Sequence, residues 1–204
     1  MAGLRLLVYD ATCRGPRALY LSTIWTAGAR LFSGLSAYDA FFGAKSWDEA
    51  LEWLATVRAD EPIEEVQYWG HGNFGSIRLG AQNLELASLD PSGPFRAGLD
   101  RVRDRIVGPE ALIWLRTCEA FGTRRGQDFA RGLADFFGCR VAGHTYVIGW
   151  AQSGLHVLRP GEEARWSERE GLHPHRPNRA RWSGLLEPNT VPFLSARLPR
   201  WARR

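Results

Sequence analysis

A histidine and a cysteine follow closely on two segments of the sequence that are predicted to be strands. His71 follows the segment at residues 65–69 and Cys118 follows the apolar run at residues 111–115, so 47 residues separate the two. A free thiol has a pKa of about 8.5 and needs a nearby imidazole or dipole to ionise at neutral pH. Histidine is also suited to protonating a leaving amine. These two residue types therefore indicate nucleophilic chemistry through a thiolate.

The elements that must position this pair alternate between strands and helices. Short segments bounded by turn signals, apolar at residues 4–9 and 111–115, predict strands at residues 4–9, 38–42, 65–69, 111–115 and 139–142. Helical spacing of apolar residues predicts helices at residues 18–35, 46–57, 95–106 and around 129–137. The apolar residues at 18–35 are only weakly periodic. Ser46 and Glu49 form a capping-box pattern, which marks the start of the second helix. This alternation predicts an α/β fold, a mainly parallel sheet with helices on both faces.

In such a sheet the carboxyl ends of the strands meet on one rim, where ligands usually bind. Neighbouring parallel strands would therefore place His71 and Cys118 side by side. Gly72, which has no Cβ, would let a substrate carbonyl approach the backbone, and the amides of Gly72 and Cys118 could form an oxyanion hole. Strand alternation puts Arg116 on the same side as Cys118, as a candidate pocket floor.

Each of these residues also has an ordinary structural interpretation. A single cysteine at a strand end is usually a small buried hydrophobe, and a single histidine is usually a surface or hydrogen-bonded residue. Cys139 fits that description and is assigned to the core. The pair is the stronger signal because both members fall where the fold places its ligands.

The charge of the chain is unevenly distributed. Its 204 residues carry a formal net charge of +4, and all basic residues but Lys45 are arginines. Residues 1–158 hold 16 basic and 17 acidic side chains, whereas residues 159–204 hold 10 and 5, with six of the 11 prolines. We therefore expect an α/β domain at residues 1–158 and a basic, Pro/Arg-rich extension at residues 159–204 that packs on it. The overall basicity does not predict a nucleic-acid-binding protein.

Several other classes are excluded by the sequence. No stretch approaches the roughly eighteen apolar residues of a membrane span. Residues 1–10 lack the length and cleavage site of a signal peptide, and the three cysteines are widely spaced with no Cys-x-x-Cys pair. We therefore expect a cytoplasmic protein with reduced thiols and with neither a metal nor another cofactor.

Two blocks of the sequence resemble a known group of proteins. Residues 68–80 read YWGHGNFGSIRLG, and residues 115–122 read LRTCEAFG, followed by Gly126, Phe129, Leu133, Gly138 and the VAG of residues 141–143. These blocks resemble caspase-like bacterial proteins related to the CHAT peptidases, in clan CD, and are most similar to a bacterial domain family of unknown function with a caspase-like core. The histidine stands about fifty residues before the cysteine, as in caspases. The resemblance covers roughly residues 4–150.

The resemblance implies a caspase–haemoglobinase fold and a cysteine endopeptidase that works through a thioester acyl-enzyme. It assigns His71 as general acid/base, Cys118 as nucleophile, and the amides of Gly72 and Cys118 as the oxyanion hole. It implies a protein or peptide substrate and, as in relatives, an activating partner protein. Glu119 departs from the arginine or glycine that caspases have after the cysteine, and its carboxylate would raise the pKa of the thiol.

The specificity of such an enzyme is left open by the sequence. Arg116 stands two residues before Cys118, where caspases line their primary pocket, and would favour an acidic side chain before the cut. Relatives that cut after arginine or lysine have acidic residues there, and Asp10 could play that part. The candidate substrate-binding residues are thus Asp10, Arg116 and Glu119. The alternative without a role in substrate binding is that the charges of Asp10 and Arg116 neutralise each other.

Three functional hypotheses remain. The first is the cysteine endopeptidase, and the second is a catalytically silent module that uses the same fold for interaction in a larger bacterial assembly. The third is a binder of acidic surfaces through arginines of the extension, namely Arg176, Arg179, Arg181, Arg200, Arg203 and Arg204. We prefer the first because a pure scaffold has no need of His71, Gly72 and Cys118 together.

Overall fold

The computed structural model describes residues 3–13, 21–34 and 37–202. Its main sheet consists of six strands, β1 (Leu4–Asp10), β2 (Ala40–Ala44), β3 (Ile63–Trp69), β7 (Leu112–Arg116), β8 (Arg140–His144) and β10 (Leu155–Leu158). They lie in the order β10-β8-β7-β3-β1-β2, and every neighbouring pair is parallel except β8 with β10. The prediction of a mixed α/β fold with a mainly parallel sheet is confirmed.

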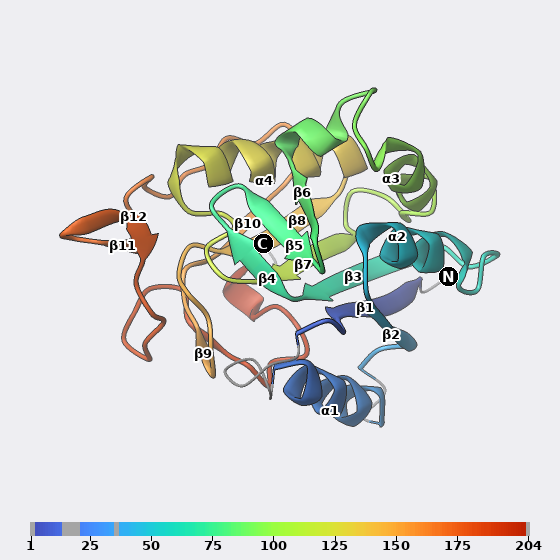
Figure 1. The fold of residues 1–204 in the computed structure, drawn as a ribbon, viewed down its shortest axis with the longest axis horizontal. Coiled ribbons are helices and arrows are strands. Elements are labelled where there is room, and N and C mark those ends of the chain that lie inside the picture. Colours follow the sequence, from blue (N-terminus) through green and yellow to red (C-terminus); the bar gives the residue numbers. More distant parts are fainter. Residues whose placement is uncertain (1–2, 14–20, 35–36, 203–204) are drawn as a thin grey trace.

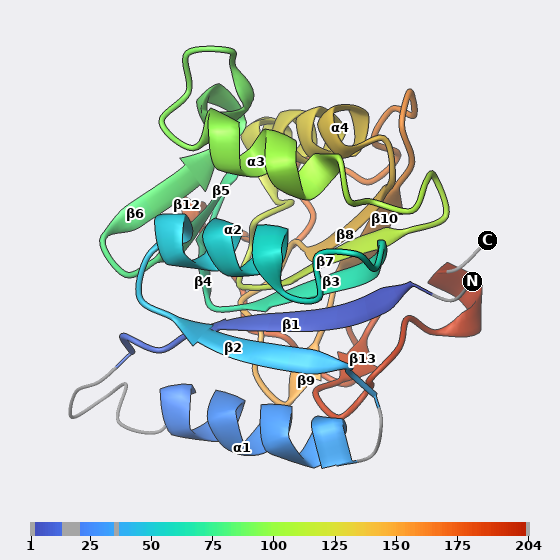
Figure 2. The ribbon, with the colours of Figure 1, turned by 90° about the vertical axis from the view of Figure 1, so that its right-hand side faces the viewer.

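Four α-helices of the described residues flank this sheet. Three of them, α2 (Trp47–Thr56), α3 (Arg96–Arg103) and α4 (Thr123–Phe137), cover one face, and α1 (Leu21–Gly34) lies on the other (Figures 1 and 2). Beside α1, the second face is covered by the chain after β10. Helices therefore lie on both faces, as predicted.

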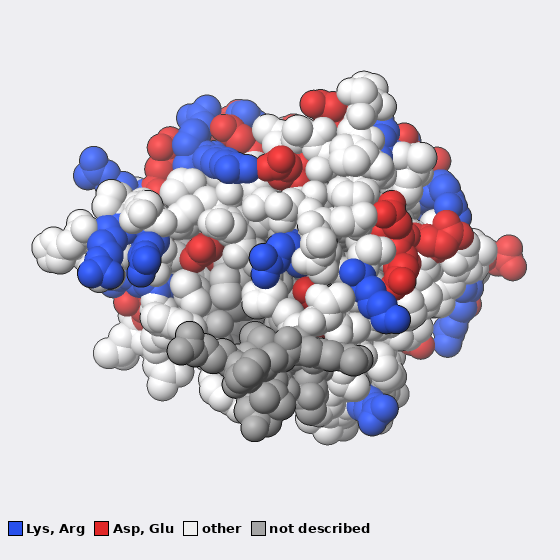
Figure 3. All heavy atoms as spheres, viewed as in Figure 1, with Lys and Arg blue, Asp and Glu red and all other residues white. Residues whose placement is uncertain are grey.

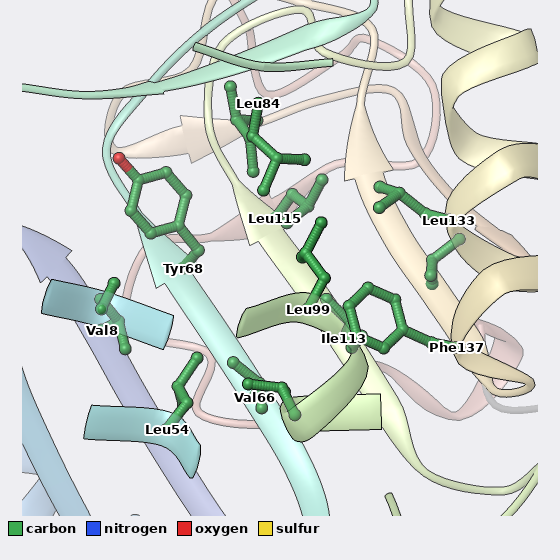
Figure 4. Packing of buried hydrophobic residues seen from close by; sticks show 14 of the residues in the cluster. Val8, Leu54, Val66, Tyr68, Leu84, Leu99, Ile113, Leu115, Leu133 and Phe137 are labelled. Carbon is green, nitrogen blue, oxygen red and sulfur yellow. The ribbon is translucent and has the colours of Figure 1, made fainter. Parts of the chain in front are cut away.

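The larger core lies between the sheet and the three helices. Alternate residues of the buried strands point into it, including Val8 of β1, Val66 of β3 and Ile113 of β7 (Figure 4). α4 adds Leu133 and Phe137 from the face that its apolar spacing predicted. Burial of these apolar strand faces is the main force that orders the sheet. It thereby fixes where the strands end.

The second face carries two smaller apolar clusters. Trp25 of α1 packs with Leu7, Trp69 and neighbouring residues, whereas Trp114 packs with Val191 and Leu198 of the C-terminal chain. Because successive residues of β7 alternate between faces, Trp114 and Arg116 point to this side and away from the α2–α4 core. The side of the sheet that carries Arg116 is therefore enclosed by the extension.

A small three-stranded sheet follows β3. It consists of β4 (His71–Asn73), β5 (Ser76–Leu79) and β6 (Gln82–Glu85), and a short 3₁₀ helix at Leu86–Leu89 comes next. The hairpin of β5 and β6 turns at Gly80, whose φ of 59° is in the left-handed region that glycine adopts without strain. His71 therefore begins a new strand and does not simply trail β3.

The chain after residue 158 is mostly irregular. It forms β11 (Leu172–His173), β12 (Arg176–Ala180), β13 (Val191–Pro192), which pairs with β9 (Ala151–Gln152), and a 3₁₀ turn at Arg200–Ala202. Trp166 anchors it: the indole is buried, its Nε1 donates to the Phe121 carbonyl at 2.9 Å, and the ring stacks on His156. The extension is thus held against the α/β domain.

Basic and acidic side chains are interspersed on the face seen in Figure 3. In the extension, Arg159 pairs with Glu110 at 2.7 Å and Arg181 with Glu187 at 3.1 Å. Of the arginines predicted as contacts for acidic surfaces, Arg176, Arg179 and Arg200 are exposed, and Arg203 and Arg204 lie outside the described residues.

Some predicted bounds differ from the structure. The strand predicted at residues 38–42 begins two residues later, and the strand predicted at residues 139–142 lies at Arg140–His144. Of the helix predicted at residues 18–35, the structure describes 21–34, which are helical, and residues 18–20 and 35 lie outside the described part.

Candidate active site

The two candidate catalytic residues meet because β3 and β7 are parallel neighbours in register. Trp69 is paired with Arg116, and His71 and Cys118 each lie two residues further along their chains. Both side chains line one cavity of about 360 Å³ at this rim of the sheet. The prediction from strand ends therefore placed both residues at one site.

His71 is partly buried, and its side chain contacts Cys13 and Trp25. Its Nε2 lies 2.9 Å from the Sγ of Cys13, and its ring meets the Trp25 indole edge-on. Burial lowers the pKa of His71, Arg78 lowers it further, and Asp10 opposes the shift. The imidazole is consequently neutral at pH 7 and able to accept a proton.

Cys13 and Asp10 form a chain of contacts behind His71. The Sγ of Cys13 donates to Oδ2 of Asp10 at 3.6 Å, and burial together with this carboxylate raises the pKa of the thiol to about 12. Because the S–H proton is directed to Asp10, the sulfur can accept Nε2–H of His71. This arrangement favours the histidine tautomer whose Nδ1 carries the lone pair.

Cys118 is half-buried at the end of β7. Burial raises the pKa of its thiol, and the negative charge of Glu119 raises it further. Hydrogen bonds from the backbone N–H groups of Ile148 and of Cys118 itself act in the opposite direction. The thiol is therefore protonated at rest, with two amides directed at its sulfur.

Glu119 occupies a strained backbone position. Its φ of 43° lies in the left-handed region, which costs a residue with a Cβ roughly 1–2 kcal/mol. Its N–H donates to the Tyr146 carbonyl at 2.9 Å, and its carbonyl accepts from Gly122 at 3.0 Å. This sharp turn ends β7 and exposes Cys118 at the cavity. The expected effect of the Glu119 carboxylate on the pKa of Cys118 has the predicted sign.

Gly72 packs directly against the Cys118 turn. A Cβ at this position would lie 2.3 Å from the Cys118 carbonyl oxygen and 2.7 Å from Oγ1 of Thr117. The space that the glycine leaves is thus filled by the protein backbone. The sequence interpretation gave this space to a substrate carbonyl, and the structure corrects it: the missing Cβ allows β4 and the Cys118 turn to touch.

Arg116 is buried on the floor of the cavity, as strand alternation predicted. Its Nε and Nη2 donate to Oε1 of Gln152 at 3.0 and 2.8 Å, Nη1 donates to the Ser195 carbonyl at 3.0 Å, and Nη2 donates to the Phe193 carbonyl at 2.5 Å. Its guanidinium also lies over the rings of Trp69, Trp114 and Phe193. Burial lowers the pKa of this guanidinium to about 10, so it stays charged.

Asp10 does not meet Arg116 or the cavity. Its side chain is buried, Oδ1 accepts from the N–H and hydroxyl of Thr12 at 2.7 and 2.6 Å, and Oδ2 accepts from Cys13 and from the Gly80 N–H. Asp10 is absent from the described residues that line the cavity. Its predicted place in a substrate pocket is therefore wrong, and so is the alternative that it neutralises Arg116.

Several residues of this site escaped the sequence interpretation. Cys13 and Ile148 carry no motif, and their roles depend on contacts made in the folded chain. The aromatic walls are Trp25, Trp69, Trp150, Trp182 and Phe193. The tryptophans of the extension could have indicated that this segment contributes to the site, because aromatic residues are unusual in a segment without regular structure.

Neither a metal site nor a membrane helix emerges from the described residues. Within residues 3–13, 21–34 and 37–202, no three His, Cys, Asp or Glu side chains are grouped to hold a metal ion. Over the same residues, no helix combines the length and apolar character needed to cross a membrane.

Comparison with known protein families gives a match over the central part of the chain. Residues 30–156 match the family described as Domain of unknown function (DUF4347), a span of more than half the chain. The chain belongs to this family. No curated protein matches it. The DUF4347 span includes His71, Gly72, Arg116, Cys118 and Ile148, whereas the Cys13 contact and part of the aromatic wall lie outside it.

Proposed function

We propose that this DUF4347 protein is a caspase-like cysteine endopeptidase in which His71 and Cys118 act as a dyad. The observation that carries the proposal is their placement two residues beyond paired positions of β3 and β7, on one cavity. A nucleophile and a base at adjacent strand ends, beside a concave site, are the arrangement that acyl transfer needs. The parallel sheet with helices on both faces is consistent with the caspase–haemoglobinase fold that the sequence blocks imply.

The chemistry follows from the protonation states at rest. Neutral His71 takes the Cys118 proton as the sulfur attacks the scissile carbonyl carbon, and the C=O bond opens to an oxyanion. The imidazolium then gives its proton to the leaving amine as the C–N bond breaks, leaving a thioester. Water, deprotonated by His71, hydrolyses the thioester and restores the thiol.

The oxyanion needs donors close to Cys118 Sγ. The backbone N–H groups of Cys118 and Ile148 both stabilise the thiolate form of that sulfur, so both are directed at the reacting centre. We assign them as oxyanion donors, beside the Gly72 amide that the family resemblance implies. Ile148 lies in the segment between β8 and β9, which also lines the cavity.

Cys13 acts in this scheme as a positioning residue. Its sulfur holds Nε2 of His71 at 2.9 Å, which leaves Nδ1 as the base. Cys13→Ala removes this support, and we expect kcat to fall about tenfold with KM unchanged. Cys13→Ser restores an acceptor and should recover most of the rate. A purely structural role would lower stability equally in both variants and leave kcat of the folded enzyme unchanged.

The raised pKa of Cys118 has a consequence for regulation. A protonated thiol beside a neutral imidazole describes a resting enzyme, because the thiolate is the attacking species. We infer that substrate binding, aided by the activating partner that the resemblance implies, brings Nδ1 of His71 to Sγ of Cys118. Such tightening on substrate binding is common in enzymes whose catalytic hydrogen bonds are long at rest.

The direct test compares wild type with Cys118→Ala and Cys13→Ala on an unfolded protein substrate, such as reduced carboxymethylated casein, with fragments read by mass spectrometry. We expect new peptides from wild type, fewer from Cys13→Ala and none from Cys118→Ala. Identical fragment patterns in wild type and Cys118→Ala, together with no labelling by a thiol-directed peptide probe, would refute the proposal.

The same pKa directions favour one second candidate, a catalytically silent interaction module. In that case the thiol of Cys118 and the imidazole of His71 stay neutral under all conditions, and no partner or substrate activates them. The labelling result decides between them: a silent module would alkylate at Cys118 with equal rates in wild type and His71→Ala, because the histidine would not assist the thiol.

A further inference from the structure

The cavity beside Cys118 has walls made of aromatic rings. Trp69 and Phe193 pack against each other with centroids 5.3 Å apart, and Trp150 meets Phe193 edge-on at 5.8 Å. Trp182 adds another wall and Val147 and Ile148 add aliphatic surface. The volume of about 360 Å³ lies in the range of ~300–1,000 Å³ typical of sites that enclose small organic groups.

The only basic side chain among the described residues that line this cavity, apart from the neutral His71, is already occupied. Arg116 directs its guanidinium N–H groups to Gln152 and to the carbonyls of Phe193 and Ser195, and aromatic faces cover its plane. A substrate carboxylate would have to displace those acceptors and leave two carbonyls without donors. Arg116 thus supports the wall and is not a receptor for an acidic side chain.

A basic side chain finds no receptor there either. Asp10 is turned toward Thr12 and Cys13, and the described lining includes no Asp or Glu. An ammonium or guanidinium entering the cavity would lose water without gaining a carboxylate, and it would also approach the positive charge of Arg116. Both charged classes of side chain are therefore disfavoured by the same wall.

We propose that this cavity is the specificity pocket for an aromatic or large aliphatic side chain immediately before the cleaved bond. The inference rests on the proposed peptidase function, because it places the scissile carbonyl at Cys118. Stacking and edge contacts with the indoles bind such a side chain, and Arg116, held by the extension, orders the wall from behind. Phenylalanine and leucine are the side chains that best suit it.

Part of this pocket lies outside the family span. Trp25 precedes residue 30, and Trp182 and Phe193 follow residue 156. β13 brings Phe193 to the cavity by pairing with β9, and Val147 is bridged to Trp182. The DUF4347 span thus carries the dyad, while the segments around it determine what the pocket accepts.

The first test uses peptides of the form acetyl-Ala-Ala-X-aminomethylcoumarin, with X set to Phe, Leu, Asp or Arg, and the enzyme as it exists. We expect kcat/KM for Phe and Leu to exceed that for Asp and Arg by about 100-fold. Preferred cleavage after Asp or Arg would overturn the pocket assignment while leaving the peptidase proposal intact.

A matched pair of variants locates the preference in the wall. Trp182→Ala removes a ring that lines the cavity, whereas Trp201→Ala removes a partly exposed indole of the 3₁₀ turn Arg200–Ala202 that does not line it. We expect about a fivefold loss of kcat/KM for the Phe peptide in the first variant and no change in the second. Equal effects of the two substitutions would contradict the assignment.

Binding separates the pocket from the chemistry. Cys118→Ala cannot acylate, so quenching of tryptophan fluorescence by acetyl-Ala-Ala-X-amide peptides measures recognition alone. We expect the Phe peptide to bind at least tenfold more tightly than the Asp or Arg peptide. Selective binding of Phe without cleavage by wild type would refute the peptidase and keep the pocket. Equal or tighter binding of a charged peptide, or no binding of Phe, would refute the pocket.

Discussion

The contact between Gly72 and the Cys118 turn offers the sharpest structural test of the site. The substitution Gly72→Ala adds one methyl group at a position whose φ lies outside the left-handed region, so the backbone itself tolerates alanine. The new Cβ would nevertheless lie 2.3 Å from the Cys118 carbonyl oxygen. All of the expected effect therefore comes from steric separation of β4 and the turn.

The size of that separation follows from the distances. An ordinary contact begins at 3.4 Å, so the Cys118 carbonyl must move away from the new Cβ by about 1 Å, and Oγ1 of Thr117, at 2.7 Å, must move as well. Overpacking of this kind costs roughly 1–3 kcal/mol of folding free energy. A shift of about 1 Å between a base and a nucleophile reduces rates by roughly 100-fold.

Two measurements check this prediction. Urea denaturation gives the free energy of unfolding, and hydrolysis of the Phe peptide gives kcat/KM. Gly149→Ala is the matched control, because Gly149 lines the same cavity but a Cβ there meets no atom within 4 Å. We expect the control to stay within about 0.5 kcal/mol of wild type. Wild-type stability and rate in Gly72→Ala would show that β4 does not touch the Cys118 turn.

Substitutions at three further positions test the surroundings of the site. Glu119→Gln and Glu119→Gly both remove the carboxylate, so each should lower the pH at which iodoacetamide alkylates Cys118. Only Glu119→Gly should also add about 1 kcal/mol of stability, because only glycine adopts the φ of 43° without strain. An unchanged alkylation profile would contradict the role of this carboxylate. Arg116→Lys should lose about 2–3 kcal/mol in urea denaturation, because an ammonium cannot replace the guanidinium fork toward three acceptors, and a loss below 0.5 kcal/mol would count against it. Burial lowers the pKa of His144 to about 3 in the folded protein, so the unfolded chain is protonated at this residue at a higher pH. The free energy of unfolding should therefore fall by roughly 1 kcal/mol per pH unit as the pH drops from 6.5 toward 3. His144→Gln should flatten that slope, and an unaltered slope would assign the acid sensitivity to another group.

The elements that could be predicted from the sequence are those whose burial is continuous. β1 and β7 are apolar on both faces for most of their length and end at charged residues, which gives short runs that only a buried strand explains. β3 also buries Glu65 and Gln67, and its end is marked by the glycines at residues 70 and 72. The start of α2 followed from Ser46, whose hydroxyl accepts from the Glu49 N–H at 3.2 Å. These signals are local, and the strand ends that they define are also what brought His71 and Cys118 together.

The elements that could not be predicted depend on partners far along the chain. β9 and β13 contain two residues each and exist because they pair with one another across about forty residues. β10 is an antiparallel edge strand whose pattern of Leu155, His156, Val157 and Leu158 is too short to distinguish from a loop. The predicted domain boundary after residue 158 falls at the end of β10.

The candidate site shows the same division between local and distant information. The positions of His71, Cys118 and Arg116 at the cavity followed from strand ends and alternation. The role of Asp10 was misjudged because its two-residue turn to Thr12 satisfies the carboxylate before any substrate could. The contact of Cys13 with His71 required the close approach of segments 58 residues apart, which no sequence pattern reports.

The central claim, that His71 and Cys118 act together, is tested most directly by the site and rate of covalent labelling. An acetyl-Ala-Ala-Phe acyloxymethyl ketone is incubated with wild type and His71→Ala, and the adduct is located by peptide mass mapping. We predict a single adduct on Cys118 in wild type and at least a 100-fold slower reaction in His71→Ala, with circular dichroism confirming that the variant is folded. An adduct on Cys13, or an equal rate in both proteins, would contradict the account.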